Sequence, residues 1–171
     1  MGKGRIRPFE VFVLGLASAG GVGYFPLAPG TAGTVVGVLV FLLYSPLPPW
    51  LYFLSTAAFF ALACWVSGKA QAIWGEIDCP RIVIDEVAGY LITMAFLPCT
   101  LTTLAGGFVF FRVLDIIKPP PAGVADRRMK NGAGVVLDDA VAGIYANVLL
   151  RFILYCRPEF LFLLERFSGP G

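Results

Sequence analysis

Histidine is absent from this sequence of 171 residues, and only 14% of its residues carry a charged side chain. Without histidine, no imidazole is available as a general base, nucleophile or metal ligand. This absence disfavours phosphohistidine enzymes and the acid phosphatases that attack through histidine. Soluble domains of this length usually carry about 25% charged residues. The net charge of +2 is also too small to indicate nucleic-acid binding.

Cysteine is scarce and shows no paired pattern. The four cysteines are Cys64, Cys79, Cys99 and Cys156, and no two of them have CxxC spacing. We expect them to be packing residues or free thiols rather than a disulfide framework or a zinc site. None of them is followed six residues later by arginine, and no DxD motif occurs. A phosphatase that works through a cysteinyl or aspartyl phosphate is therefore disfavoured.

Apolar residues are abundant, at 58% of the chain, and the mean hydropathy is +0.81. A soluble core of this size could not bury so much apolar surface, so lipid must cover part of it. Apolar stretches occur at residues 32–44, 50–67, 82–97, 101–117 and 135–156. Each is near or slightly below the roughly 20 residues that cross a bilayer. We expect one all-α domain over residues 1–171, a polytopic membrane helical bundle with about four to five membrane segments.

The N-terminal segment and the basic residues predict an orientation in the membrane. Three basic residues precede a short apolar run at 9–16, which contains Glu10. An Ala-Ser-Ala sequence after this run resembles a signal-peptide cleavage site, but the run is short. We therefore expect an uncleaved N-terminal helix that is interfacial or re-entrant. Basic residues favour the cytoplasmic side for the N-terminus and for the loops at 68–81 and 118–134.

Carboxylates fall at one side of the membrane in three of the apolar stretches. Asp85 and Glu86 lie about one turn into the third stretch, and Asp115 lies about one turn before the end of the fourth. Asp138 and Asp139 lie in the expected first turn of the fifth stretch. A charge at the centre of a lipid-facing helix costs about 2.5–3.5 kcal/mol, and clustering adds repulsion. A divalent cation relieves both penalties at once.

A simpler explanation is that helix N-termini favour acidic residues through the helix dipole. This explains one acid each in the third and fifth stretches. It does not explain the adjacent acidic pairs, nor Asp115, which lies near a helix C-terminus. We therefore favour a metal site.

A short similarity links two of the acidic segments. Residues 85–90 are DEVAGY and residues 139–143 are DAVAG. In both, an acid is followed four residues later by glycine on the same face of the helix. A small residue at that position lets another helix approach closely.

Cations lie beside these acids in the sequence. Arg112 lies three residues before Asp115, and Lys118 lies about one turn beyond it and is followed by proline. Each can pair with an acid or bind a phosphate. Arg127 and Arg128 in the next loop face anionic head groups or serve as ordinary cytoplasmic charge, and the sequence leaves both alternatives open.

A glycine- and proline-rich segment at 20–34 leads into the first long apolar stretch. Free backbone N–H groups and the dipole at a helix N-terminus can hold a phosphate there. The segment lacks the lysine of a P-loop, so nucleotide binding is not expected.

Together, these blocks resemble the phosphatidylglycerophosphatase A family of bacterial membrane lipid phosphatases. The matching segments are 23–33 (GYFPLAPGTAG), 84–89 (IDEVAG), 111–119 (FRVLDIIKP), 126–128 (DRR) and 132–143 (GAGVVLDDAVAG). Any one block is unspecific, whereas their order and joint presence are specific. The resemblance implies Mg²⁺-dependent hydrolysis of phosphatidylglycerophosphate to phosphatidylglycerol and phosphate. It also implies the bacterial inner membrane, with the active site on the cytoplasmic side.

Residue roles follow as hypotheses for attack by a metal-activated water. The candidate metal ligands are Asp85, Glu86, Asp115, Asp138 and Asp139. We expect Asp85, Asp115 and Glu86 to be catalytic, with Glu86 as a ligand or the general base. The candidate phosphate-binding residues are Lys118, Arg112, Thr31, Arg127 and Arg128, and Asp126 is a further candidate in the loop. The expected partners are Mg²⁺, an anionic phospholipid substrate and the membrane, with no nucleic acid or nucleotide.

Two other functions compete with this hypothesis. A CDP-alcohol phosphotransferase also uses membrane aspartates and a divalent metal, and residues 134–138 match part of its pattern. However, Ala142 stands where the next aspartate of that pattern is expected. A cation or proton carrier also places acids inside membrane helices, but it needs access from both sides. Here the acids lie at one side only.

Overall fold

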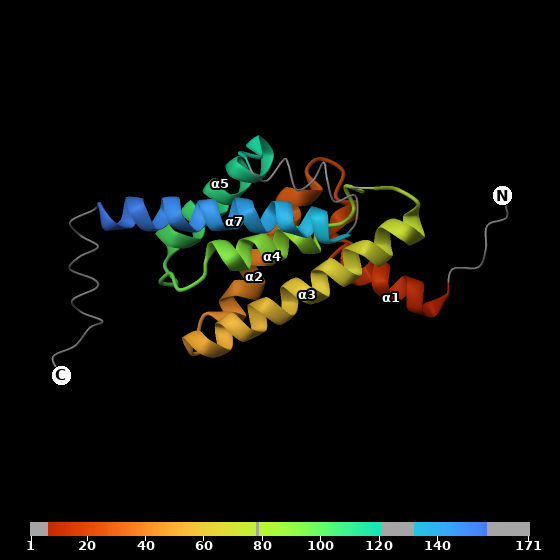
Figure 1. The fold of residues 1–171 in the computed structure, drawn as a ribbon, viewed down its shortest axis with the longest axis horizontal. Helices are drawn as coiled ribbons and strands as arrows, with labels where there is room; N and C mark the ends of the chain where they lie inside the picture. Colours follow the sequence, from red (N-terminus) through yellow and green to blue (C-terminus); the bar gives the residue numbers. More distant parts are fainter. Residues whose placement is uncertain (1–6, 78, 121–131, 157–171) are drawn as a thin grey trace.

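The computed structural model of the chain describes residues 7–77, 79–120 and 132–156, and every regular element within them is a helix. The elements are α1 (Pro8–Ala17), η1 (Val22–Tyr24), α2 (Pro29–Tyr44), α3 (Pro49–Trp74), α4 (Ile84–Thr93), α5 (Leu101–Ile117) and α7 (Gly132–Tyr155). The expected all-α architecture is confirmed. In Figure 1, α3 crosses the bundle obliquely to α7, and α4 lies between these two helices.

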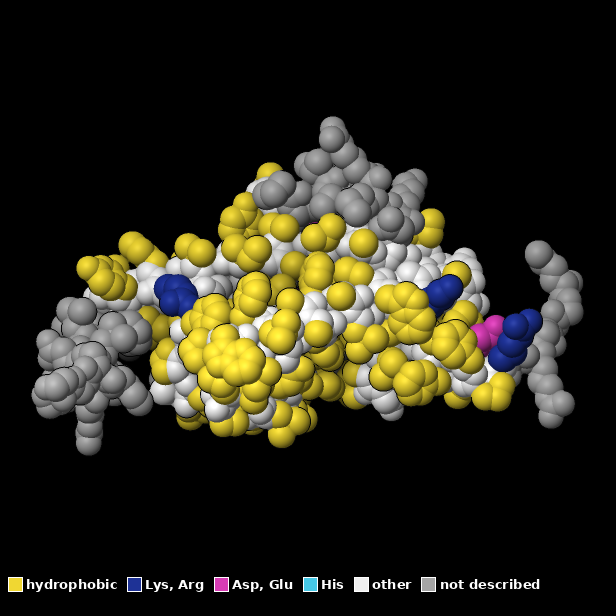
Figure 2. Space-filling model, turned by 60° about the horizontal axis from the view of Figure 1, so that its bottom comes forward, with side chains coloured by type: hydrophobic (Ala, Val, Ile, Leu, Met, Phe, Trp, Pro, Cys, Tyr) yellow, Lys and Arg dark blue, Asp and Glu magenta, His cyan; other side chains and the backbone are white. Residues whose placement is uncertain are grey.

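Two of the described helices, α3 with 26 residues and α7 with 24, are long and apolar enough to cross a membrane by length and composition. Helices α2 and α5 have 16 and 17 residues, which is below the roughly 20 that span a bilayer. The four to five membrane segments expected from the sequence therefore stay a prediction. Figure 2 shows one face covered mainly by hydrophobic side chains, and the charged side chains visible there lie toward its two ends.

Helix α4 differs from the membrane segment expected at 82–97, because it has only ten residues and is almost entirely buried inside protein. Its C-terminal end is capped by side chains of α7. Asn147 donates from Nδ2 to the carbonyl oxygens of Thr93 (2.7 Å) and Ala95 (3.0 Å). Arg151 donates from Nη2 to the same Ala95 oxygen at 2.7 Å. These bonds satisfy carbonyl groups at the end of the helix, so α4 can end within the bundle.

Helices α4 and α7 cross in direct backbone contact at two glycines. A Cβ atom on Gly143 would lie 2.5 Å from the carbonyl oxygen of Gly89, and one on Gly89 would lie 2.9 Å from the carbonyl oxygen of Asp139. The close approach predicted from the acid–glycine repeat is confirmed. Because each glycine follows an acid by about one turn, the contact brings Asp85 and Asp139 to the same level of the bundle.

Helix α2 lies on α4 through a row of glycines of its own. A Cβ on Gly33 would lie 2.7 Å from Cβ of Val83, and one on Gly37 would lie 2.9 Å from Cβ of Tyr90. Small residues at this spacing let two helix backbones approach closely. The N-terminus of α2 is therefore held beside the start of α4.

Helix α7 begins at Gly132, three residues before the apolar stretch that marks it in the sequence. A Cβ on Gly132 would collide with the backbone nitrogen of Gly68 in α3, so α7 begins in contact with α3. Asp138 and Asp139 consequently lie in the second turn of α7. Their expected place in the first turn was wrong, because the helix begins with Gly132, Ala133 and Gly134, before the apolar stretch from which its start was expected.

The glycine contact between α4 and α7 can be tested by adding a single methyl group. We expect Gly143→Ala to lower the free energy of unfolding by about 1–3 kcal/mol, because the backbone oxygen it meets has nowhere to move. The measurement is the thermal unfolding midpoint in detergent. Gly15→Ala is the matched control, since a Cβ there meets no atom within 4 Å and alanine favours the helix. Equal midpoints for the two variants would contradict the close crossing.

Candidate active site

A cavity of about 360 Å³ opens where α4 and α7 begin and α5 ends. It is lined by Ala28, Pro29, Gly30, Cys79, Pro80, Ile82, Asp85, Glu86, Arg112, Asp115, Ile116, Lys118, Val135, Asp138 and Asp139. All five acids singled out in the sequence are among these residues. They come from three helices, as the sequence pattern predicted, and they share the cavity with two cations.

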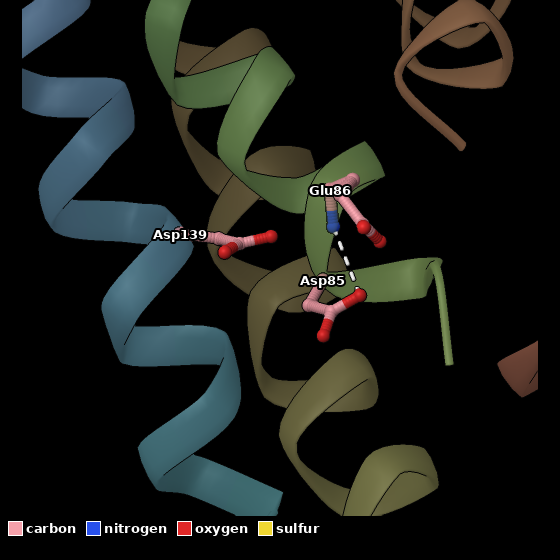
Figure 3. A group of neighbouring side chains, drawn as sticks. All are labelled: Asp85, Glu86 and Asp139. Atoms are coloured by element: carbon pink, nitrogen blue, oxygen red, sulfur yellow. Dashed lines mark hydrogen bonds between the residues drawn. The ribbon is translucent and has the colours of Figure 1, made fainter. Parts of the chain in front are cut away.

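Three of the carboxylates form the centre of the cavity. Asp85, Glu86 and Asp139 each offer an oxygen atom, and these oxygens lie within 4.8 Å of one another. Figure 3 shows Asp139 reaching from α7 toward α4, which carries the other two side chains. The backbone N–H of Glu86 donates to Oδ1 of Asp85 at 3.1 Å, which fixes the Asp85 carboxylate at the first turn of α4.

These carboxylates are buried and only partly satisfied. Asp85 is 4% exposed and Asp139 is 6% exposed. Among the described residues, Oε2 of Glu86 and Oδ2 of Asp139 have no hydrogen-bond partner. Like charges at this separation repel strongly where water is excluded, and a buried carboxylate without partners is costly. Hard oxygen donors grouped in this way suit Mg²⁺, Ca²⁺ or Mn²⁺, so these residues fit a divalent cation.

Arg112 joins two of the acids at the edge of this centre. Its Nη1 lies 2.7 Å from Oδ2 of Asp115 and 3.9 Å from Oε1 of Glu86. The pairing of Arg112 with Asp115 agrees with their spacing of three residues on α5. A Cβ on Gly30 would lie 3.0 Å from Nη2 of Arg112 and would collide with Oε1 of Glu86. The N-terminal turn of α2 therefore lies directly against both side chains.

Lys118 pairs with Asp138 across the cavity. Lys118 ends α5 in the left-handed conformation, with φ of 49°, and its N–H donates to the carbonyl oxygen of Leu114. This left-handed residue ends the helix. Pro119 follows it directly in the sequence. The Lys118 side chain is 39% exposed, whereas that of Asp138 is only 3% exposed. The Lys118 side chain is therefore partly exposed along its length, while its ammonium group reaches into the cavity to the buried Asp138.

A loop between α3 and α4 forms a wall that the sequence did not predict. Cys79, Pro80 and Ile82 line the cavity, and Arg81 stabilises the loop by donating to Oε2 of Glu76 at 2.8 Å. Hydrogen bonds from Cys79 and Arg81 lower the pKa of Glu76 from its ordinary value. No local pattern identifies these wall residues, since their place depends on how the loop folds back.

All four cysteines are free thiols, as expected.

The remaining predicted site residues have different outcomes. Thr31 is half-buried and is not among the residues that line the cavity, whereas its neighbour Gly30 is. Asp126, Arg127 and Arg128 lie outside the described residues. Their expected roles therefore stay predictions.

Comparison with known proteins points to one family. The family model described as phosphatidylglycerophosphatase A matches residues 15–154. A protein of Haemophilus influenzae named phosphatidylglycerophosphatase A is 36% identical, over 88% of this chain and 91% of its own length. One of Escherichia coli with the same name is 35% identical, over 88% of each chain. A Bacteroides thetaiotaomicron protein named putative phosphatidylinositol-3-phosphatase is 36% identical, over 84% of this chain and 94% of its own. No solved structure matches.

Thermal unfolding tests whether the central carboxylates bind a cation. We expect Mg²⁺ or Mn²⁺ to raise the unfolding midpoint, because a ligand of the folded state at 100 times its Kd stabilises by about 2.7 kcal/mol. Asp139→Asn should remove most of this shift. Glu10→Gln is the matched control, since Glu10 lies on α1 and caps its backbone at Arg7. Equal shifts in the two variants would place the ion elsewhere.

Proposed function

The chain belongs to the phosphatidylglycerophosphatase A family, and we propose that its acidic cavity uses Mg²⁺ to hydrolyse phosphatidylglycerophosphate to phosphatidylglycerol and phosphate. The observation that supports the metal is the group of buried carboxylates on α4 and α7. These side chains lie in one cavity with Arg112 and Lys118. Such a site provides negative groups for a cation and positive groups for a phosphate.

The metal-binding residues of this proposal fall into two groups. Asp85 and Asp139 hold the ion, and Glu86 is a further ligand or the general base, because the oxygens of all three converge. Asp115 and Asp138 line the same cavity but pair with Arg112 and Lys118. These two acids serve as further ligands when the cations turn to the substrate phosphate. When bound, Mg²⁺ supplies positive charge to the phosphate oxygens and activates water.

The substrate phosphate binds between α2 and α5 in this proposal. Arg112 and Lys118 supply the positive charge from α5. The N-terminus of α2 supplies backbone N–H groups after Pro29, since Ala28 caps the helix without a side-chain hydrogen bond. Thr31 contributes from this turn. Arg127 and Arg128, which lie outside the described residues, are proposed to add positive charge.

Glu86 is the candidate general base. Its Oε2 is buried and lacks a hydrogen-bond partner in the part of the chain that the structure describes. Its Oε1 faces Arg112 at 3.9 Å. This arrangement leaves one carboxylate oxygen to orient the attacking water and to accept its proton. Asp85, held by the Glu86 backbone N–H, and Asp115, held by Arg112, position the groups around it.

The proposal places the cavity at the cytoplasmic side of the bacterial inner membrane. Helix α3 carries Trp50 near its first residue and Trp74 at its last, and tryptophan is enriched at both membrane interfaces. Its 26 residues rise about 39 Å, which suits the distance between two interfaces. The cavity lies at the Trp74 end, beside the loop that carries Arg81. Basic residues there agree with the positive-inside rule.

The two rival functions gain no support from the described site. A carrier needs polar groups along a path through the bilayer, whereas the acids of α4, α5 and α7 all line one cavity at one end of the bundle. A CDP-alcohol phosphotransferase needs a further aspartate at position 142, where the helix carries buried Ala142. One relative is named putative phosphatidylinositol-3-phosphatase. The head group of the substrate is therefore tested by comparing two lipids directly.

Phosphate release from diacyl phosphatidylglycerophosphate in detergent micelles tests the proposed function. We expect the wild type to need Mg²⁺ and to lose activity with EDTA. Glu86→Gln should lower kcat by about 10²- to 10⁴-fold, the usual loss for a general base. Glu10→Gln should match the wild type. Full activity with EDTA, or in Glu86→Gln, would refute the mechanism. Faster phosphate release from phosphatidylinositol 3-phosphate would show that this lipid, and not phosphatidylglycerophosphate, is the preferred substrate.

A further inference from the structure

The cavity has an apolar side at its mouth, formed by α5. Among the described residues that line the cavity, Pro80 and Ile116 are the exposed ones. Ile116 is 71% exposed, so its side chain belongs both to the cavity wall and to the outer surface. Pro80 belongs to the loop that contains the Glu76–Arg81 ion pair. The loop also exposes Ile77, at 62%, but its surface carries the charges of this ion pair, whereas Ile116 lies on a helix whose exposed side chains can be followed away from the cavity.

An exposed apolar stripe continues from Ile116 along α5. Val109 is 53% exposed and Val113 is 45% exposed. The spacings of four and three residues place Val109, Val113 and Ile116 on one face of the helix. We call these three residues the α5 stripe. At 1.5 Å per residue, the stripe runs about 10 Å from the mouth of the cavity toward the other end of α5.

The same helix presents its polar side chains to the cavity. Arg112 and Asp115 line the cavity and pair with each other, while the α5 stripe faces outward. A cation and an apolar surface therefore adjoin at Ile116, one turn from Arg112 on the helix. A molecule with an anionic head and a hydrocarbon tail matches this order of surfaces. The cation Arg112 and the apolar α5 stripe lie on the same helix, so they fit a phospholipid whose phosphate lies in the cavity and whose acyl chain lies on the stripe.

We propose that the α5 stripe binds an acyl chain of the phospholipid substrate while the substrate phosphate lies in the cavity. The inference rests on the proposed function and adds the route by which the substrate enters, sideways from the lipid along α5. Contact with the stripe stabilises the bound diacyl substrate through van der Waals packing, because the acyl chain exchanges contacts with other lipid tails for contacts with the valine side chains. A phosphomonoester without acyl chains uses the same cavity but gains nothing from the stripe.

Kinetics with two substrates tests this inference. The variants are Val109→Asn and Val113→Asn on the stripe, with Val148→Asn as the matched control. Val148 is 60% exposed on α7 and does not line the cavity. The substrates are long-chain phosphatidylglycerophosphate in mixed micelles and its deacylated, water-soluble counterpart. We expect the stripe variants to raise KM for the diacyl substrate about three- to ten-fold, with kcat unchanged. The deacylated substrate should show no change in any variant.

The outcomes separate this inference from the proposed function. If the wild type hydrolyses neither substrate, the proposed function fails. If it hydrolyses both and the stripe variants behave like Val148→Asn, the assignment of the stripe is wrong. Equal losses on both substrates in the stripe variants would also overturn it, because the damage would then lie in the cavity itself.

Discussion

The backbone contact between Gly89 of α4 and Gly143 of α7 is the constraint on which the rest of the site depends. Each glycine follows an acid by one helical turn, so the contact carries Asp85 and Asp139 together. Bringing these carboxylates together without water is unfavourable, since both the burial and the repulsion of the charges cost free energy. Packing of small residues, and not attraction between the functional groups, therefore assembles the centre. A cation that binds there would recover part of that cost.

The two cations divide the carboxylates of the cavity into an outer group, defined by its pairing with them, and an inner group of Asp85, Glu86 and Asp139; Asp138 of the outer group is as deeply buried as the inner acids. Arg112 and Lys118 pair with Asp115 and Asp138 at the end of α5. The inner group on α4 and α7 keeps oxygens without hydrogen-bond partners among the described residues. This division separates the two tasks of a phosphatase site, because the inner oxygens suit a metal ion and the outer cations suit a phosphate. The residues for both tasks lie near helix ends. The dipole at the N-terminus of α2 adds positive potential there, which favours a bound phosphate.

The sequence predicted which acids come together better than the course of the helices that carry them. Acids in apolar segments are costly, and three such segments carry acids at one side of the membrane, so the grouping of Asp85 and Asp139 followed from hydropathy and orientation alone. The extent of α4 did not follow, because hydropathy cannot tell burial in protein from burial in lipid. The side chains of Asn147 and Arg151, distant in sequence, bind the backbone where α4 ends. The wall residue Cys79 was missed because its place depends on tertiary packing alone.

The location of a bound Mn²⁺ ion in a crystal tests the central claim most directly, since manganese scatters anomalously and prefers the same oxygen ligands as Mg²⁺. The account predicts an anomalous peak between α4 and α7, within coordination distance of carboxylate oxygens from Asp85, Glu86 and Asp139. A peak bound only by other residues, or none in a crystal soaked well above the concentration that stabilises the protein, would contradict it.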